Sequence, residues 1–266
     1  MIRAEASTSE LRSDALAIRK KFLQMHHRVK AGHIGTGLSC IEMLAFLHRS
    51  WLRPEDKFIL SKGHGASSLY ATLHHYGVLT DAELDTYYQD GTLLPAHPAP
   101  NAFPAIPAAT GSLGHGLPIA AGIAFAQKNL HKTGARVAAL LSDGECNEGS
   151  VWEAVLFAGH HHLTNLLVLV DANGLQGFGS TKDVLDMEPM VAKWESFGFA
   201  AREIDGHDFD QLREASSTPH ATRPTVIIAR TSKGKGVSFM EGKMEWHYLP
   251  MSDAHYAQAL ADLESA

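Results

Sequence analysis

The chain is poor in cysteine and in runs of positive charge. Only Cys40 and Cys146 occur among its 266 residues, and because no C-x-x-C pair is present, neither a disulfide framework nor a structural zinc site is expected. Lysine and arginine number 23 against 29 aspartate and glutamate residues, giving a net charge of −6, and no basic run is long enough to follow a phosphate backbone. Nucleic acid is therefore not an expected partner.

Long apolar runs are also lacking. Every apolar stretch is shorter than the roughly 18–20 residues that cross a bilayer, and residues 1–14 are polar where a secretory signal would be apolar. We therefore expect a cytoplasmic protein without membrane contact. Hydrophobic residues make up 45% of the sequence, and no change in composition marks a boundary, so a single domain over residues 1–266 is expected.

Two common enzyme signatures are absent. No G-x-G-x-x-G follows a predicted strand, and the glycines at 111, 114 and 116 have a different spacing, which argues against a dinucleotide site. G-x-S-x-G is missing as well, which excludes a hydrolase of the nucleophile-elbow type.

Apolar runs alternate with helical patterns along the chain. Apolar residues recur at intervals of four and three from Leu11 to Val29, which predicts an amphipathic helix from Ser9, and Ser39 with Glu42 has the pattern of a capping box for a second helix. Further helices are predicted at 67–76, 117–130, from 150, at 187–197 and 209–215, and strands at 57–60, 136–141, 166–170, 199–204 and 225–229.

Strands that are apolar throughout and alternate with helices indicate a parallel sheet covered on both faces. The predicted fold class is therefore α/β, a doubly wound and mainly parallel sheet, with binding expected at the carboxyl ends of the strands. The segment 91–107 is rich in proline and alanine and is expected to be a functional loop.

Two polar segments follow predicted strands. Asp143-Gly144 comes after one strand and Asn173 after the next, so their side-chain oxygens could meet on one hard cation such as Mg²⁺. A glycine there would let the backbone approach a phosphate closely. A strand followed by Asp-Gly is as often a simple turn, and the residues alone leave that alternative open.

Histidine is unusually frequent, with 17 residues in the chain. Five lie beside glycine or proline or in loop-like segments, where they could line a cleft and move protons. They are His33, His64, His97, His115 and His247.

Seven segments, in order and over nearly the whole chain, resemble the motifs of the thiamine-diphosphate-binding half of transketolase. They are AGHIGTGLS, KFILSKGHGASSLYA, PAHP, TGSLGHGLPIAAGIA, SDGECNEGSVWEA, VDANGLQ and TSKGKGVSFMEGKMEWH. The resemblance implies transfer of a two-carbon ketol unit from a ketose to an aldose, with thiamine diphosphate and Mg²⁺ (or Ca²⁺) as cofactors.

The resemblance also implies roles for individual residues. Asp143, Asn173 and the carbonyl of Leu175 match the metal ligands, and Asn173 also lies in the cofactor site. Gly144, His64 and His247 match residues at the diphosphate, and Gly111 and Leu113 match residues at the two rings of the cofactor. The catalytic histidines around the sugar are matched by His33, His97, His247 and His64. Glu148, beside the cofactor, and Glu153 match the glutamates that link the two active sites of a dimer.

A complete transketolase continues into a pyrimidine-binding domain and a C-terminal domain, whereas this sequence ends at residue 266, shortly after His247. We therefore expect the N-terminal subunit of a split transketolase, whose partner in an α2β2 assembly is a C-terminal subunit and whose substrate is a sugar or sugar phosphate. Gly177-Phe178-Gly179 stands where the split family commonly has isoleucine, an acid and glycine, and Tyr248 where glycine is usual. These departures favour a specialised ketose.

Two alternatives remain. The first is one subunit of a 2-oxo acid decarboxylating enzyme of the deoxyxylulose-phosphate synthase or E1 dehydrogenase type, which the loop histidines disfavour because pyruvate has no hydroxyl groups for them to bind. The second is a degenerate cofactor-binding protein, which the intact Asp143 and Asn173 disfavour.

Overall fold

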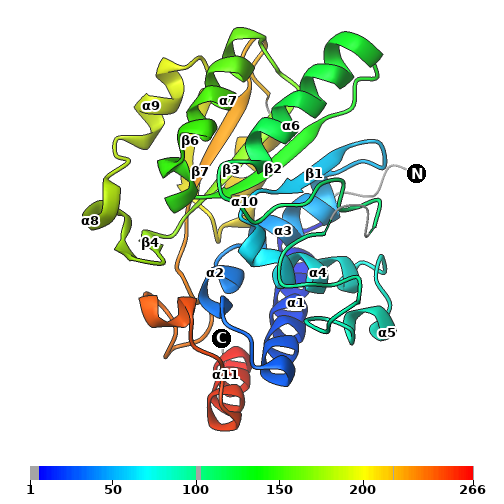
Figure 1. Cartoon of the computed structure of the whole chain (residues 1–266), viewed down its shortest axis with the longest axis vertical. Coiled ribbons are helices and arrows are strands. Elements are labelled where there is room, and N and C mark those ends of the chain that lie inside the picture. Colours follow the sequence, from blue (N-terminus) through cyan, green and yellow to red (C-terminus); the bar gives the residue numbers. More distant parts are fainter. Residues whose placement is uncertain (1–5, 100–102, 218, 266) are drawn as a thin grey trace.

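A parallel sheet of five strands forms the middle layer of the molecule (Figure 1), whose computed structural model describes residues 6–99, 103–217 and 219–265. The strand order is β1-β2-β3-β7-β6, and every neighbouring pair is parallel. The strands are β1 (Lys57–Leu60), β2 (Val137–Ser142), β3 (Leu166–Ala172), β6 (Ala200–Asp205) and β7 (Thr225–Arg230). The α/β class, the parallel pairing and all five strand positions predicted from the sequence are confirmed.

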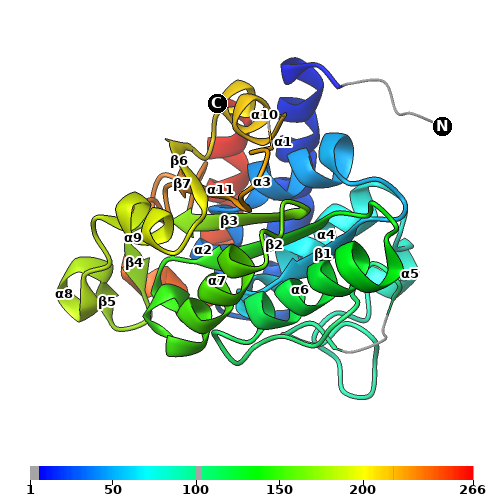
Figure 2. The same ribbon diagram turned by 90° about the horizontal axis from the view of Figure 1, so that it is seen from above.

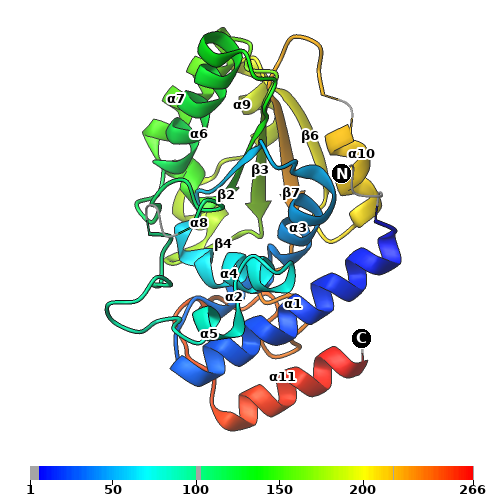
Figure 3. The same cartoon turned by 90° about the vertical axis from the view of Figure 1, so that its right-hand side faces the viewer.

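Helices cover both faces of this sheet (Figures 2 and 3). Successive residues of a strand point to opposite faces, so in β2 Ala138 and Leu140 join one apolar core while Val137, Ala139 and Leu141 join the other. The first core is closed by α1 (Thr8–Val29), α3 (Ile41–Phe46), α4 (Ala66–His75), α10 (Phe209–Ser217) and α11 (Asp253–Ser265); the second is closed by α6 (Gly116–Phe125), α7 (Gly149–His160) and α9 (Met190–Ser196).

The sequence accounts for the start, the end and the buried face of helix α1. Ser7 caps it through a capping box with Glu10, and it ends where Lys30 adopts a left-handed conformation. The predicted apolar stripe is buried, including Leu11, Ile18 and Phe22. The predicted helix is confirmed because its local signals and its packing agree.

The predicted capping box of the second helix is wrong. The Ser39 hydroxyl donates to the Thr36 carbonyl and to Asp171, while the Glu42 carboxylate accepts from Arg19. Both side chains are buried, so tertiary partners replace the local cap, and α3 begins at Ile41 without a side-chain cap.

Several short elements are not among those predicted from the sequence. These are α2 (Ile34–Leu38), α5 (Asp81–Leu84), β4 (Leu175–Gln176), β5 (Gly179–Ser180), α8 (Thr181–Leu185) and the single-turn or π-helical segments Leu47–Trp51, Gly63–Gly65, Gly144–Asn147 and η5 (Met244–His247). The helix predicted at 117–130 begins as α6 and continues as the π-helical segment Ala126–His131. The predicted loop 91–107 has no helix or strand in its described part, residues 100–102 lying outside it. Within the described ranges, no helix is long and apolar enough to cross a membrane.

Candidate active site

The carboxyl ends of four neighbouring strands meet at one edge of the sheet, and each is followed by a charged or polar side chain. Lys62 follows β1, Asp143 follows β2, Asn173 follows β3 and Lys233 follows β7. Asp171, within β3, also points to this edge, since its carboxylate contacts the Lys62 ammonium. A cavity of about 300 Å³ opens beside these groups, where doubly wound folds bind their ligands.

Four of the five predicted histidines line this cavity. The ring of His33 lies 5.6 Å from that of His64, 6.3 Å from that of His97 and 5.0 Å from that of His247, measured between centroids. His115 does not join them, since it is exposed at the start of α6 with its Nδ1 3.1 Å from the Ser112 carbonyl. The expectation for His115 is therefore wrong, because its glycine neighbours shape a helix start instead of a cleft wall.

The environment keeps these histidines neutral. Burial, followed by the nearby Lys233 ammonium, lowers the pKa of His247 to about 3. Burial also lowers the pKa of His33, that of His97 and, far below its usual value, that of His64. Neutral imidazoles can both accept and donate a proton at pH 7, which suits them to hydroxyl groups of a ligand.

Asp143 forms the acidic wall of the cavity. Its carboxylate accepts the N–H of Gly144 at 2.8 Å and the N–H of Gly174 at 2.6 Å, and it is 3% exposed. Burial and the neighbouring Asp171 raise the pKa of Asp143 to about 6. A carboxylate whose ionised form is disfavoured in this way would be stabilised by a cation beside it.

Asn173 lies on the loop that leads from β3 into β4, close to Asp143, and Leu175 is the first residue of β4. The side-chain oxygen of Asn173 accepts the N–H of Leu175 at 3.1 Å, and both residues line the cavity. Carboxylate, amide and carbonyl oxygens are the donor set that Mg²⁺ and Ca²⁺ prefer. Within the described part of the chain, no three His, Cys, Asp or Glu side chains are arranged to hold a metal, so a hard-cation site here would depend on this mixed set of oxygens.

Two buried lysines supply positive charge to the same edge. Lys62 is fully buried and donates to Asp171 and to the Thr36 carbonyl, and although burial opposes its charge, Asp171 raises its pKa. Lys233 lies 3.0 Å from Nδ1 of His247 and donates to the Leu175 carbonyl at 3.3 Å. Burial, with Lys62 nearby, lowers the pKa of Lys233 to about 8.

Gly111 and Leu113, matched to the cofactor rings by sequence, line the cavity from the loop before α6. This loop packs closely on the segment after β1, because a Cβ on Gly63 would lie 2.7 Å from the backbone nitrogen of Gly111. The buried carboxylate of Glu145 connects this loop to the segment after β1, since it accepts the N–H of Gly114 at 2.9 Å and the Ser61 hydroxyl. The loop is therefore fixed at both of its sides.

Glu148 and Glu153 lie outside the cavity. Both are exposed, Glu148 directly before α7 and Glu153 within it. Their position on an outer helix is compatible with a contact between chains.

Sequence reasoning missed several residues at the site, namely Thr36, Lys62, Glu145, Asp171 and Lys233. A usable signal existed for two of them: Lys62 and Lys233 both stand in Ser-Lys-Gly segments directly after strands that end at the same sheet edge. Glu145 and Asp171 were visible as acidic residues after strands, but their burial depends on the fold.

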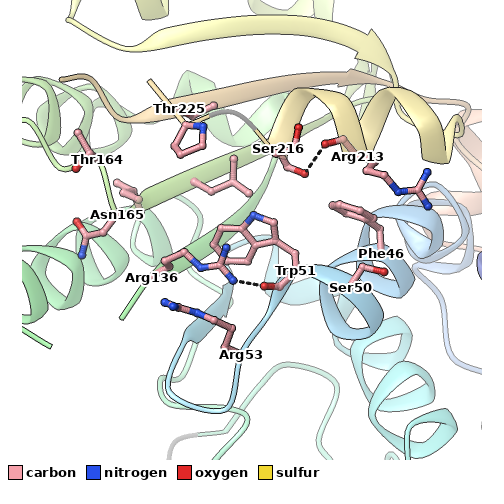
Figure 4. Close-up of a pocket in the computed structure, with 14 residues that line it drawn as sticks. Phe46, Ser50, Trp51, Arg53, Arg136, Thr164, Asn165, Arg213, Ser216 and Thr225 are labelled. Carbon is pink, nitrogen blue, oxygen red and sulfur yellow. Dashed lines mark hydrogen bonds between the residues drawn. The ribbon is translucent and has the colours of Figure 1, made fainter. Parts of the chain in front are cut away.

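A larger cavity, of about 490 Å³, lies at the opposite, amino edge of the sheet (Figure 4). Its wall includes Thr225, where β7 begins, and Arg136, whose guanidinium stacks 3.9 Å from the centre of the Trp51 ring and binds Asp56. This cavity contains none of the residues matched to the cofactor or the metal.

Comparison with known proteins agrees with this geometry. The profile of the family described as "Transketolase, thiamine diphosphate binding domain" matches residues 12–263. The chain is 40% identical over 262 residues to one of the subunits of apulose-4-phosphate transketolase from Actinobacillus succinogenes, covering 93% of this chain and 94% of that protein. It is 37% identical to one of the subunits of 6-deoxy-6-sulfo-D-fructose transketolase from Clostridium sp., covering 96% of each chain.

Solved structures show the same fold. A transketolase from Leishmania mexicana superposes with a TM-score of 0.88 at 29% identity, over 98% of this chain and 42% of that one. A transketolase from Campylobacter jejuni gives 0.89 at 27% identity, over 97% and 43%. The chain thus spans less than half the length of these solved relatives.

Proposed function

The chain belongs to the transketolase family, and on that premise we propose that it is the cofactor-binding subunit of a split transketolase, a thiamine diphosphate-dependent transferase that moves a two-carbon ketol unit between sugars. The family, its thiamine diphosphate-binding domain and its class of transferase are those predicted from the sequence motifs, and these predictions are confirmed. The residue roles, metal, partner and substrate are proposals.

The observation that carries the proposal is the meeting of neutral histidines with the Asp143 carboxylate, Asn173 and Leu175 in one cavity at the carboxyl edge of the sheet. We assign Mg²⁺ (or Ca²⁺) to the side chains of Asp143 and Asn173 and the carbonyl of Leu175. The buried Asp143 carboxylate supports this assignment, because a divalent cation would stabilise its charge. Gly144 lines the same cavity, and we assign its backbone to the diphosphate.

The diphosphate would lie against His64 and His247, with Lys233 adding positive charge beside them. The two rings would lie along the loop that carries Gly111 and Leu113. When bound, thiamine diphosphate supplies the carbanion chemistry that breaks the carbon–carbon bond of the ketose. The protein binds and orients the cofactor there.

The proton-transfer groups for the sugar are proposed to be His33 and His97, with His247 at the boundary between sugar and diphosphate. They are neutral at pH 7, so each can hold a hydroxyl group through one ring nitrogen and exchange a proton with it. Pyruvate offers no such hydroxyl groups, and the cluster therefore supports a sugar donor over a 2-oxo acid.

A partner surface is proposed on α6 and α7, which lie side by side on the outside of the sheet (Figure 2). Leu156 and Phe157 of α7 are 57% and 39% exposed. Glu148 and Glu153 lie on the same helix or directly before it. We propose that this face joins a second copy of the chain and that each copy binds a partner subunit with a pyrimidine-binding domain, which gives an α2β2 assembly.

The substrate is proposed to be a specialised ketose. The two relatives of similar length named above act on apulose 4-phosphate and on 6-deoxy-6-sulfo-D-fructose, which are not standard pentose phosphates. Donor screening should therefore include both of these sugars beside xylulose 5-phosphate.

The proposal is tested by purifying the tagged chain from its native cells and identifying its complexes by native mass spectrometry, with thiamine diphosphate monitored. A stoichiometric second subunit, with cofactor present in the complex and ketol transfer by it, is the expected result. A chain that neither binds thiamine diphosphate nor gains activity with any co-purified protein would contradict the proposal.

A further inference from the structure

One exposed tyrosine links two segments of the proposed active site. Tyr248 directly follows η5, and its hydroxyl donates to the carbonyl of Gly177 at 2.8 Å. Gly177 lies in the tight turn between β4 and β5. The bond therefore joins the segment that carries His247 to the loop that carries Asn173 and Leu175.

The tyrosine end of this link is well anchored. The N–H of His33 donates to the carbonyl of His247 at 2.9 Å, and the backbone of Tyr248 packs so closely on Gly32 that a Cβ there would lie 2.7 Å from the Tyr248 carbonyl oxygen. The phenol thus projects from a fixed backbone.

The glycine end is held more weakly. β4 and β5 are two residues each, and Phe178, beside Gly177, is 86% exposed. The β3 side of the loop is held by the 2.6 Å bond from the Gly174 N–H to Asp143 and the 2.9 Å bond from the Thr181 N–H to the Gly174 carbonyl. Nearer the turn, the contacts are a 3.2 Å bond from Gln176 to Asn147 and the 3.3 Å bond from Lys233 to the Leu175 carbonyl. A short hairpin of this kind is marginal by itself, so one additional bond at its turn changes how well the loop is ordered.

The fit between the two residues is specific. A Cβ on Gly177 would lie 2.5 Å from the Tyr248 hydroxyl oxygen but 3.5 Å from the ring carbon that bears it. Gly177 does not have a positive φ, so alanine is compatible with its backbone, and the closest obstacle to that methyl group is the hydroxyl itself.

We propose that Tyr248 and Gly177 form a latch that positions the 173–177 loop for the metal and the diphosphate, with Tyr248 acting as a positioning residue. The latch rests on the proposed function for its ligand. The ordering of the loop by the phenol hydroxyl does not depend on the ligand.

The test compares Tyr248→Phe, Gly177→Ala and the double variant in the complex with the partner subunit. Calorimetry measures the affinity for thiamine diphosphate at fixed Mg²⁺, and hydrogen exchange with mass spectrometry measures protection of residues 173–180 without ligand. Loss of one hydrogen bond should weaken cofactor binding by about threefold to tenfold in Tyr248→Phe and should speed exchange in this peptide. Tyr88→Phe, the same change at an exposed tyrosine remote from the cavity, should alter neither.

The double variant gives the sharpest result. Gly177→Ala alone should weaken binding because its methyl group displaces the hydroxyl, but in the Tyr248→Phe background it should add almost nothing. Full additivity of the two changes, or wild-type affinity and exchange in Tyr248→Phe, would overturn the latch. Failure of the wild-type complex to bind thiamine diphosphate would instead overturn the proposed function, and the exchange data would still decide whether the hydroxyl orders the loop.

Discussion

Charged residues lie at both edges of the sheet, but their surroundings shift the pKa values of Asp56 and Asp143 in opposite directions. At the amino edge, burial opposes the charge of Asp56, but hydrogen bonds from Arg53 and Arg136 hold its pKa at about 2. At the carboxyl edge, burial raises the pKa of Asp143 to about 6 and lowers that of Lys233 to about 8. Charge is therefore favoured on Asp56 and disfavoured on Asp143 and Lys233, although Lys62 and Asp171 stabilise each other's charge at the carboxyl edge.

This difference in pKa distinguishes the ion pairs of Asp56, which stabilise the fold, from the groups of the proposed binding site. The amino-edge cavity is the larger one, at about 490 Å³ against about 300 Å³, yet the charges around it already have partners. Titratable groups whose charged form is disfavoured by their surroundings gather at sites where a bound ligand stabilises that charge.

The largest expected effect is that of Asp143→Ala. Removing a proposed direct metal ligand should weaken Mg²⁺-dependent binding of thiamine diphosphate by more than about 100-fold, since even indirect partners of a metal commonly contribute 10- to 100-fold. Calorimetry on the complex measures this. Asp210→Ala, which removes an exposed carboxylate of α10 that does not line the cavity, is the matched control and should bind normally, whereas normal binding by Asp143→Ala would refute the metal assignment.

His33→Ala should separate catalysis from binding. We expect kcat for ketol transfer to fall about 100-fold, the usual contribution of a positioned acid or base, while the affinity for thiamine diphosphate stays within about twofold. His115→Ala, at the loop histidine outside the cavity, should change neither quantity. A large loss of cofactor affinity in His33→Ala would instead place His33 at the diphosphate.

Asp56→Asn should affect stability but not binding. The carboxylate accepts bonds from two arginines, so its loss should lower the free energy of unfolding by about 1–3 kcal/mol at pH 7. Because folding depresses the pKa of Asp56 from 3.8 to about 2, its contribution is present above pH 3.8 and is lost as the pH falls toward 2. Denaturant titrations of both proteins should converge over that range; a constant difference would contradict this account.

The smallest effect is expected for Arg213→Ala. Its ion pair with Asp210 is partly exposed, at 2.7 Å, and pairs of this kind contribute about 1 kcal/mol or less. Thermal unfolding should shift only slightly and cofactor affinity should not change. Weakened cofactor binding in this variant would mean that the amino-edge cavity takes part in function.

Much of the fold could be predicted because its signals are local or periodic. The stripe from Leu11 to Val29 and the apolar strands need no knowledge of distant residues, and parallel pairing follows from their alternation with helices. Four cavity histidines could be proposed because His33, His64 and His97 stand beside glycine or proline and His247 stands in a loop-like segment. His115 also stands beside glycine, and only the fold shows that it lies outside the cavity, at the start of α6.

The remainder depends on contacts between distant segments. Lys62 is 109 residues from Asp171 in the sequence, and Ser39 is 132 residues from it, so their pairing appears only after the sheet order is fixed. The local pattern predicts a helix-capping role for Glu42, which its burial against Arg19 overrides. In the sequence Tyr248 is only a departure from the family pattern, and its contact with Gly177, 71 residues away, is visible only in the fold.

The central claim is that the carboxyl edge, and not the larger cavity at the amino edge, holds the cofactor. Hydrogen exchange of the complex with and without Mg²⁺ and thiamine diphosphate tests it most directly. We predict ligand-dependent protection in the peptides covering residues 142–147, 173–180 and 244–248, with no change around Trp51 and Arg213. Protection around Trp51 and Arg213 without protection at the carboxyl edge would contradict the account.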